Sequence, residues 1–126
     1  MDIKISNMSS VPIYQQVATQ IKSSILNGSL KYNDQLPSIR SLSKELEVGI
    51  ITVKKSYEVL LQEELIYSKG AVGYFVNDID LATVLSIKKE EYLVELKVII
   101  DNAINDGLNI EDIKGIVDKV LEEKNL

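Results

Sequence analysis

The side chains of this sequence that could do chemistry are mainly cations and hydroxyls. Arg40 is the only arginine of the chain. Its planar guanidinium can bond two acceptors on one guanine edge or clamp a phosphate, and the ordinary alternative is a surface ion pair with Glu45 or Glu47. Several lysines of the same region add positive charge, for which a solvated helix face is the ordinary alternative. The chemistry suggested by these residues is therefore phosphate or base recognition.

Groups suited to catalysis are scarce. The chain has no Cys and no His, which excludes disulfides, thiolate and imidazole catalysis, and metal sites that need either ligand. Ser41–Lys44 and Ser86–Lys89 each match Ser-x-x-Lys, but this pattern is short, and both copies fall in predicted helices without a supporting motif. A small hydrolase would need a nucleophile and base that the sequence does not offer. We therefore expect no enzymatic activity, no cofactor and no metal.

The charge is distributed unevenly along the 126 residues. Residues 1–78 hold eight basic and eight acidic side chains, whereas residues 79–126 hold six and eleven, which accounts for the whole net charge of −5. This asymmetry predicts two domains with different tasks, 1–78 and 79–126. A neutral first domain can still bind phosphate if its cations share one face.

No segment predicts export or membrane insertion. No apolar run approaches the roughly 18 residues of a membrane span, and the N-terminus lacks a basic region followed by an apolar stretch. We therefore expect a cytoplasmic protein. We also expect no membrane partner, because the acidity of residues 79–126 repels anionic lipid.

Three helices are predicted in the first domain, because apolar residues recur there at helical spacing. The first begins with Pro12 in its first turn and ends near Gly28. Ser38 is placed to cap the second helix, and Gly49 permits a tight turn into the third. The inward stripes are Ile13, Val17, Ile21 and Ile25, then Ile39, Leu42 and Leu46, then Val53, Tyr57, Leu60 and Leu61. Two such helices joined by a glycine turn are typical of a helix-turn-helix.

A β-hairpin is predicted after the third helix. Residues 65–68 and 73–76 are rich in aromatic and branched side chains, and Gly70 lies near the tip of the segment between them. Residues 30–36, with their Asn33-Asp34 turn signal, are expected to be a connector. The predicted fold class is mainly α, with a small hairpin wing on a helix-turn-helix domain.

The last 48 residues predict a C-terminal α-helical hairpin. Gly107 separates its two helices, and Asn109 with Asp112 has the spacing of a capping-box variant. The apolar faces are too wide for so short a hairpin to bury by itself, so we expect a homodimer. The predicted interface comprises Tyr92, Leu93, Leu96, Ile99, Ile100, Ala103, Ile104, Ile113, Ile116, Val117, Val120 and Leu121.

Residues 12–76 resemble the winged helix-turn-helix domain of GntR-type bacterial transcription regulators. The resemblance is carried, in order and without gaps, by Pro12–Gln16, Ile25–Leu30, Gln35–Leu42, Thr52–Lys54, Glu64–Ile66 and Gly73–Val76. The short two-helix C-terminus is similar to the YtrA-type branch. The resemblance implies a homodimeric repressor of a transporter-type operon or of its own operon. The symmetry of a dimer predicts a palindromic operator in double-stranded DNA, and an unknown small-molecule effector is a further candidate partner.

The resemblance also implies which residues contact DNA. Members typically carry Ser-Arg where this chain has Gly49-Ile50, and Arg where it has Lys54. The alternatives are core packing for the isoleucines at positions 50 and 51, and a plain turn at the hairpin tip. The implied contacts are Ser38, Arg40, Ile50, Ile51, Thr52, Lys54, Lys55, Lys69 and Gly70.

A second hypothesis for the function belongs to another class. A winged-helix protein–protein interaction module that has lost DNA binding would also have this pattern. The isoleucine at position 50 and the neutral first domain favour that hypothesis.

Overall fold

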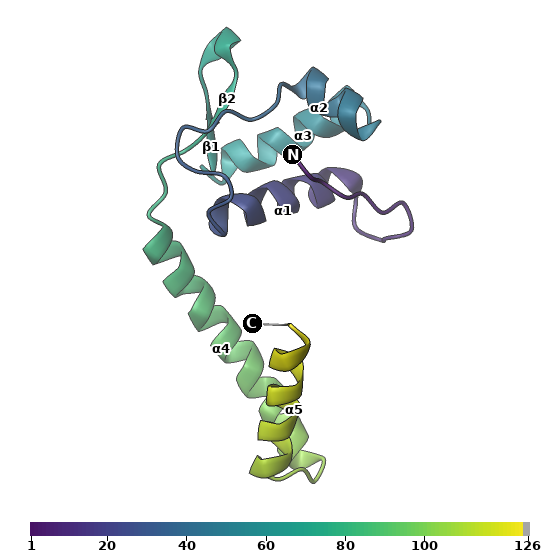
Figure 1. Cartoon of the computed structure of the whole chain (residues 1–126), viewed down its shortest axis with the longest axis vertical. Coiled ribbons are helices and arrows are strands. Elements are labelled where there is room, and N and C mark those ends of the chain that lie inside the picture. Colours follow the sequence, from purple (N-terminus) through teal and green to yellow (C-terminus); the bar gives the residue numbers. More distant parts are fainter. Residues whose placement is uncertain (125–126) are drawn as a thin grey trace. The chain divides into compact units, whose positions relative to one another are not determined.

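The computed structural model describes residues 1–124 and divides into two units, which we call the head (Met1–Leu81) and the tail (from Ala82 onward). The head holds α1 (Ile13–Leu26), α2 (Ile39–Leu46), α3 (Ile50–Gln62) and an antiparallel hairpin of β1 (Ile66–Ser68) and β2 (Tyr74–Val76), joined by a 3-10 turn, η1 (Gly70–Val72). Two further helices, α4 (Leu81–Asn105) and α5 (Ile110–Glu123), follow (Figure 1). The predicted class, mainly helical with one small hairpin, is confirmed.

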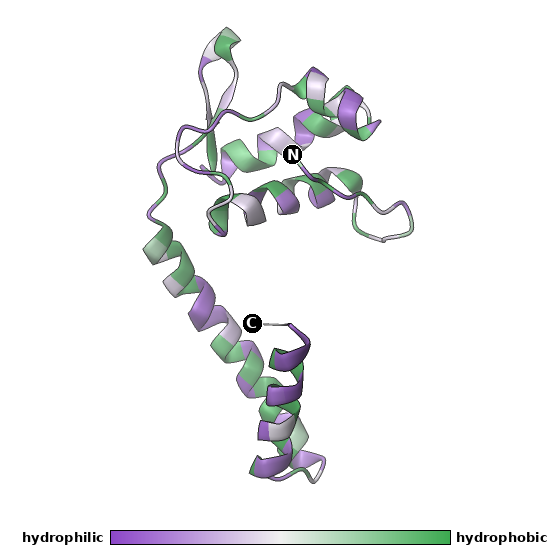
Figure 2. Ribbon diagram, in the orientation of Figure 1, coloured by the Kyte–Doolittle hydropathy of each residue, from purple (hydrophilic) through white to green (hydrophobic). Residues whose placement is uncertain are grey.

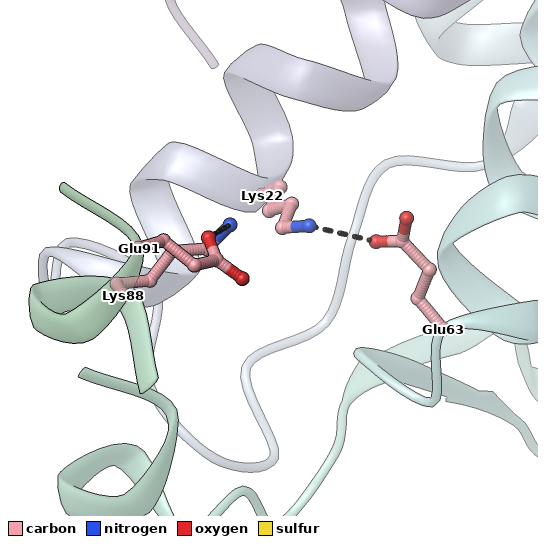
Figure 3. Close-up of polar contacts among 4 residues, drawn as sticks. All are labelled: Lys22, Glu63, Lys88 and Glu91. Carbon is pink, nitrogen blue, oxygen red and sulfur yellow. Dashed lines mark hydrogen bonds and ion pairs between the residues drawn. The ribbon is translucent and has the colours of Figure 1, made fainter. Parts of the chain in front are cut away.

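The core of the head lies between the three helices and the hairpin. Apolar side chains at every fourth position of α1 face α3, as the helical spacing predicted. An ion pair between Lys22 of α1 and Glu63, directly after α3, also joins these two helices, with 3.1 Å between Nζ and Oε2 (Figure 3). The buried apolar residues are Val17, Ala18, Ile21, Ile25, Leu36, Leu42, Val53, Tyr57, Leu60, Leu65, Ile66 and Val76.

The helix boundaries confirm one prediction and correct two. The Ser38 hydroxyl accepts a hydrogen bond from the Ser41 amide at 3.0 Å and so caps α2. Pro12 precedes α1 as its N-cap residue and is not in the first turn. The left-handed residue of the turn between α2 and α3 is Glu47, with φ 56°, whereas Gly49 is extended, with φ −62°, and lies at the N-cap of α3. The turn therefore does not use the glycine's freedom.

The hairpin has a third partner that the sequence did not predict. Its strands are three residues long, each without the first residue of the predicted segment, and Tyr67 lies opposite Phe75. Residues 33–36, expected to be only a connector, pair with the free edge of β2. The Asn33 amide donates to the Val76 carbonyl and the Leu36 amide to the Tyr74 carbonyl, both at 2.9 Å. This pairing satisfies backbone groups that an open edge would leave to solvent.

Two glutamines hold the N-terminal segment along α1. The Gln20 side-chain amide bonds the backbone N–H and C=O of Lys4 at 2.9 and 2.6 Å, and the Gln16 amide does the same for Ser6 at 2.9 and 3.0 Å. Ile3, the residue before this pair of contacts, packs against the core. The segment thus extends the core of the head without forming a strand.

The tail consists of two helices joined by a turn at Gly107, whose φ is 103°. The predicted capping box is confirmed: the Asn109 side chain accepts from the Asp112 amide at 2.9 Å, and the Asp112 carboxylate accepts from the Asn109 amide at 3.0 Å. Lys88 and Glu91 form an ion pair of 3.3 Å on the surface of α4 (Figure 3). None of the described helices is long and apolar enough to cross a membrane.

The tail has no buried core of its own. Hydrophobic residues occur along both helices (Figure 2), yet no residue of α4 or α5 is buried. An apolar groove of about 400 Å³ lies between the two helices. We call it the tail groove, and its lining residues are Leu96, Ile99, Ile100, Ala103, Ile113, Ile116, Val117, Val120 and Leu121.

Candidate nucleic-acid interface

The start of α2 presents an unpaired cation. Arg40 is exposed, and no carboxylate among the described residues lies within 4 Å of its guanidinium. The ion pair with Glu45 or Glu47 that the sequence left open is therefore not formed. Lys44, also exposed, follows Arg40 by four residues and so lies on the same side of α2. Lys44 was not among the predicted contacts, although its four-residue spacing from Arg40 in a predicted helix could have indicated it.

The start of α3 presents a mixed apolar and cationic face. Ile50 is 46% exposed and Ile51 is 82% exposed, so neither residue completes the core, and that alternative is wrong. Lys54 and Lys55 are exposed as well, three and four residues after Ile51, which places all three on one side of the helix. Thr52 is half-buried beside them. This face therefore carries both methyl groups and ammonium groups.

Lys55 does not extend freely into solvent. Its ammonium nitrogen lies 4.1 Å from the centroid of the Tyr14 ring, within the range of a cation–π contact. The backbone of Tyr14 is tied to the same turn of α3, because the buried Ser56 hydroxyl donates to the Tyr14 carbonyl at 2.8 Å. The first turn of α1 therefore supports the first turns of α3.

The hairpin tip carries the last two candidate residues, Lys69 and Gly70, and both are exposed. Gly70 has φ 56°, and a Cβ atom there would meet no atom within 4 Å. The Lys69 ammonium lies 5.3 Å from the centroid of the Phe75 ring, which in turn stacks on Tyr67 at 5.7 Å. The tip therefore presents the Lys69 ammonium, placed against the Phe75 ring, beside the open backbone of Gly70. It projects away from the helices, separate from the starts of α2 and α3 (Figure 1).

A buried tyrosine fixes the entry to α2. The Tyr57 hydroxyl donates to the Pro37 carbonyl at 2.7 Å, and its ring meets Tyr74 edge-on at 5.1 Å. Burial, with smaller contributions from Tyr74 and Glu45, raises the pKa of Tyr57 well above its usual value. The hydroxyl consequently remains a neutral donor, which holds the residue directly before the Ser38 cap against α3.

Two packed helices with an exposed second-helix start, followed by a hairpin with a cationic tip, define a winged helix-turn-helix protein of the DNA-binding type. The family described as "Bacterial regulatory proteins, gntR family" matches residues 13–76. The chain belongs to this GntR family of DNA-binding transcription regulators, so the resemblance inferred from the sequence is confirmed.

Individual relatives extend the similarity beyond the head. The chain is 32% identical over 109 residues to the HTH-type transcriptional repressor YtrA of Bacillus subtilis (strain 168), covering 86% of this chain and 84% of YtrA. A crystal structure of a transcriptional regulator from Oenococcus oeni matches 93% of this chain and 97% of that chain, with TM-score 0.71 and 29% identity. Several other curated relatives are much longer, and this chain spans less than a third of their length.

Related structures include a complex with DNA. The AraR DNA-binding domain in complex with operator ORE1 matches 60% of this chain and 93% of that chain, with TM-score 0.51 and 26% identity. This chain is therefore similar in structure to a domain that was crystallised in complex with its operator.

Proposed function

We propose that this protein is a homodimeric repressor that binds a palindromic operator, in a transporter-type operon or its own. In each protomer α3 enters the major groove and the hairpin tip approaches the adjacent minor groove. The observation that carries this proposal is the exposed start of α2 and α3, where Arg40 has no carboxylate partner among the described residues. An exposed, uncompensated guanidinium is suited to a phosphate or a guanine edge.

Related proteins support the mode of action. YtrA of Bacillus subtilis is named a transcriptional repressor, and its match with this chain extends over most of both proteins. The AraR domain was solved with its operator. By analogy we assign DNA contact to the exposed candidates at the starts of α2 and α3 and at the hairpin tip.

The tail groove supports the homodimer. Its lining is almost entirely apolar, and the described tail holds no buried residue. Apolar area left in water is unfavourable by roughly 25 cal/mol per Å², so a second copy of the same groove is its simplest cover. Two-fold symmetry then predicts operator half-sites about one DNA turn apart, roughly 10 bp or a multiple of it.

Titration of a fluorescent promoter fragment of the protein's own gene tests the proposal directly. Wild-type protein should bind at low ionic strength and weaken steeply with added salt, because cations that neutralise phosphates release counterions. Arg40→Ala should reduce affinity by about tenfold or more, whereas Lys31→Ala, an exposed cation of the connector, should not. Selection of bound sites from random DNA would give the sequence, symmetry and spacing of the operator.

The protein–protein interaction module is the second candidate, and one observation favours it. Two exposed isoleucines stand at the start of α3, one of them where the resemblance leads us to expect an arginine. Absent or salt-insensitive DNA binding, or an Arg40→Ala variant with unchanged affinity, would support this candidate over the repressor.

A further inference from the structure

We propose that Tyr14 is a positioning residue for DNA binding, which holds the Lys55 ammonium where it meets a backbone phosphate. The inference rests on the proposed function, because it requires the start of α3 to face DNA. Tyr14 lies in α1 and is not itself one of the proposed DNA contacts. Its role is to order the ammonium of Lys55, which is one of those contacts.

The contact is close and joins two elements distant in sequence. The Lys55 nitrogen lies 4.1 Å from the ring centroid of Tyr14, well inside the roughly 6 Å limit of a cation–π contact. The Tyr14 ring is in the first turn of α1, whereas Lys55 is in the second turn of α3. The ring face attracts the positive charge through its quadrupole and leaves the ammonium's outer N–H groups available to an acceptor.

The backbone that carries the ring is anchored to α3. Ser56, which has no exposed surface, donates its hydroxyl to the Tyr14 carbonyl at 2.8 Å. Ser56 directly follows Lys55 in α3. The Tyr14 backbone and the Lys55 side chain are therefore both attached to the same turn of α3. A change in the ring therefore alters the lysine without requiring α1 to move.

Holding the lysine favours binding through entropy. A free lysine side chain loses rotamer freedom when it binds a phosphate, and a side chain that is already ordered loses less. Lys54 provides the matched comparison, because it is exposed on the same face and its ammonium makes no cation–π contact with an aromatic ring of the described chain. Tyr14 should consequently support Lys55 and not Lys54.

A double-mutant cycle on the full chain tests the inference, with affinity for the promoter fragment measured across a salt series. Tyr14→Leu should weaken binding about two- to fivefold, the equivalent of one exposed cation–π contact. Tyr14→Phe, which retains the ring, should bind with wild-type affinity. Lys55→Ala should lower the magnitude of the slope of log K against log salt by about 0.9, whereas Tyr14→Leu should leave that slope unchanged because it removes no charge.

The coupling distinguishes positioning from a structural role. Tyr14→Leu should have no further effect in a Lys55→Ala background and its full effect in a Lys54→Ala background. An equal loss in both backgrounds would overturn the inference, as would tighter binding by Tyr14→Leu. If Lys55→Ala leaves affinity and slope unchanged while Arg40→Ala does not, this inference fails and the proposed function stands. If the wild-type protein binds no DNA, the proposed function fails as well.

Discussion

At the scale of single residues, the head combines a cation that stays in water with a tyrosine hydroxyl that is buried. Arg40 is exposed and unpaired within the described chain, whereas Tyr57 is 1% exposed and fully committed to one hydrogen bond. The first arrangement leaves a cation free for a ligand. The second places the Pro37 carbonyl, and with it the start of α2, at a defined position over α3.

Tyr57→Phe should destabilise the head by about 1 kcal/mol at neutral pH, because the Pro37 carbonyl loses its donor. Urea unfolding monitored by circular dichroism would measure this loss. Ile66→Val, another core change in the head, provides a comparison for packing alone. A Tyr57→Phe variant as stable as wild type would show that the hydrogen bond contributes nothing.

Tyr57 should also make the free energy of unfolding depend on pH. Burial raises the folded-state pKa of Tyr57 above the unfolded value of about 10. Its contribution to the free energy of unfolding is therefore complete below pH 10 and is lost as the pH rises further, because the unfolded chain releases a proton that the folded chain retains. The stability difference between wild type and Tyr57→Phe should narrow between pH 10 and 11. A constant difference over that range would contradict the raised pKa.

At the scale of elements, the two glycines of the turn and the hairpin have opposite roles. Gly49 is extended at the N-cap of α3, a conformation open to every residue. Gly73 has φ 130°, and a Cβ atom there would lie 3.0 Å from the Gln35 amide nitrogen, whose hydrogen bond to the Val72 carbonyl ties the connector to the hairpin. Only the second position requires glycine.

Gly49→Ser should stabilise the protein by about 0.5 kcal/mol. A serine hydroxyl at an N-cap satisfies one free helix amide, and serine also restricts the unfolded chain more than glycine does. Space is available, since the nearest atom to a new Cβ is Thr52 Oγ1 at 3.8 Å. Thermal unfolding of the variant would measure the effect, and a lower midpoint would count against the N-cap assignment.

Gly73→Ala should destabilise the hairpin by about 1–3 kcal/mol, because a non-glycine residue is strained there and would displace the Gln35 side chain. Gly70→Ala is the matched control, since its φ is also positive but no atom lies within 4 Å of a new Cβ. Amide hydrogen exchange of Lys69, whose N–H donates to the Gly73 carbonyl, would report on the hairpin. Equal protection in the two variants would show that the Gln35 contact is unimportant.

At the scale of the whole molecule, the head has a closed core and the tail does not. The described tail consists of two helices with an apolar groove between them and no buried residue. In the proposed dimer, such a hairpin would gain its stability from association. Because the proposed operator is palindromic, the same association would also bring two heads to one DNA molecule.

Val117→Asp should separate the proposed dimer. A carboxylate in the middle of the tail groove would lose its water on association without gaining a partner, at a cost of about 3 kcal/mol or roughly a hundredfold in dimer Kd. Light scattering over a concentration series would measure the change. Lys119→Asp, on the opposite side of α5 and with a larger change in charge, should remain dimeric. Equal behaviour of the two variants would contradict the tail groove as the interface.

Local order in this protein follows from the sequence alone. The apolar stripes of the helices, the Ser38 cap and the Asn109–Asp112 capping box were all predicted, because each depends on residues within one or two turns of one another. The two-helix C-terminus without an adequate core was predicted for the same reason, since the width of an apolar face can be counted along one helix. The family resemblance, carried by several ordered segments, was equally available from the residues.

The tertiary structure decided what depends on distant residues. Pairing of residues 33–36 with β2, the glutamine contacts along α1 and the position of Lys55 on Tyr14 each join segments separated by 10 or more residues. The exposure of Ile50 and Ile51, and the choice of Glu47 over Gly49 as the left-handed residue, depend on how α2 and α3 pack. Residue type and spacing describe only neighbours along the chain, whereas packing sets which side chains remain in water.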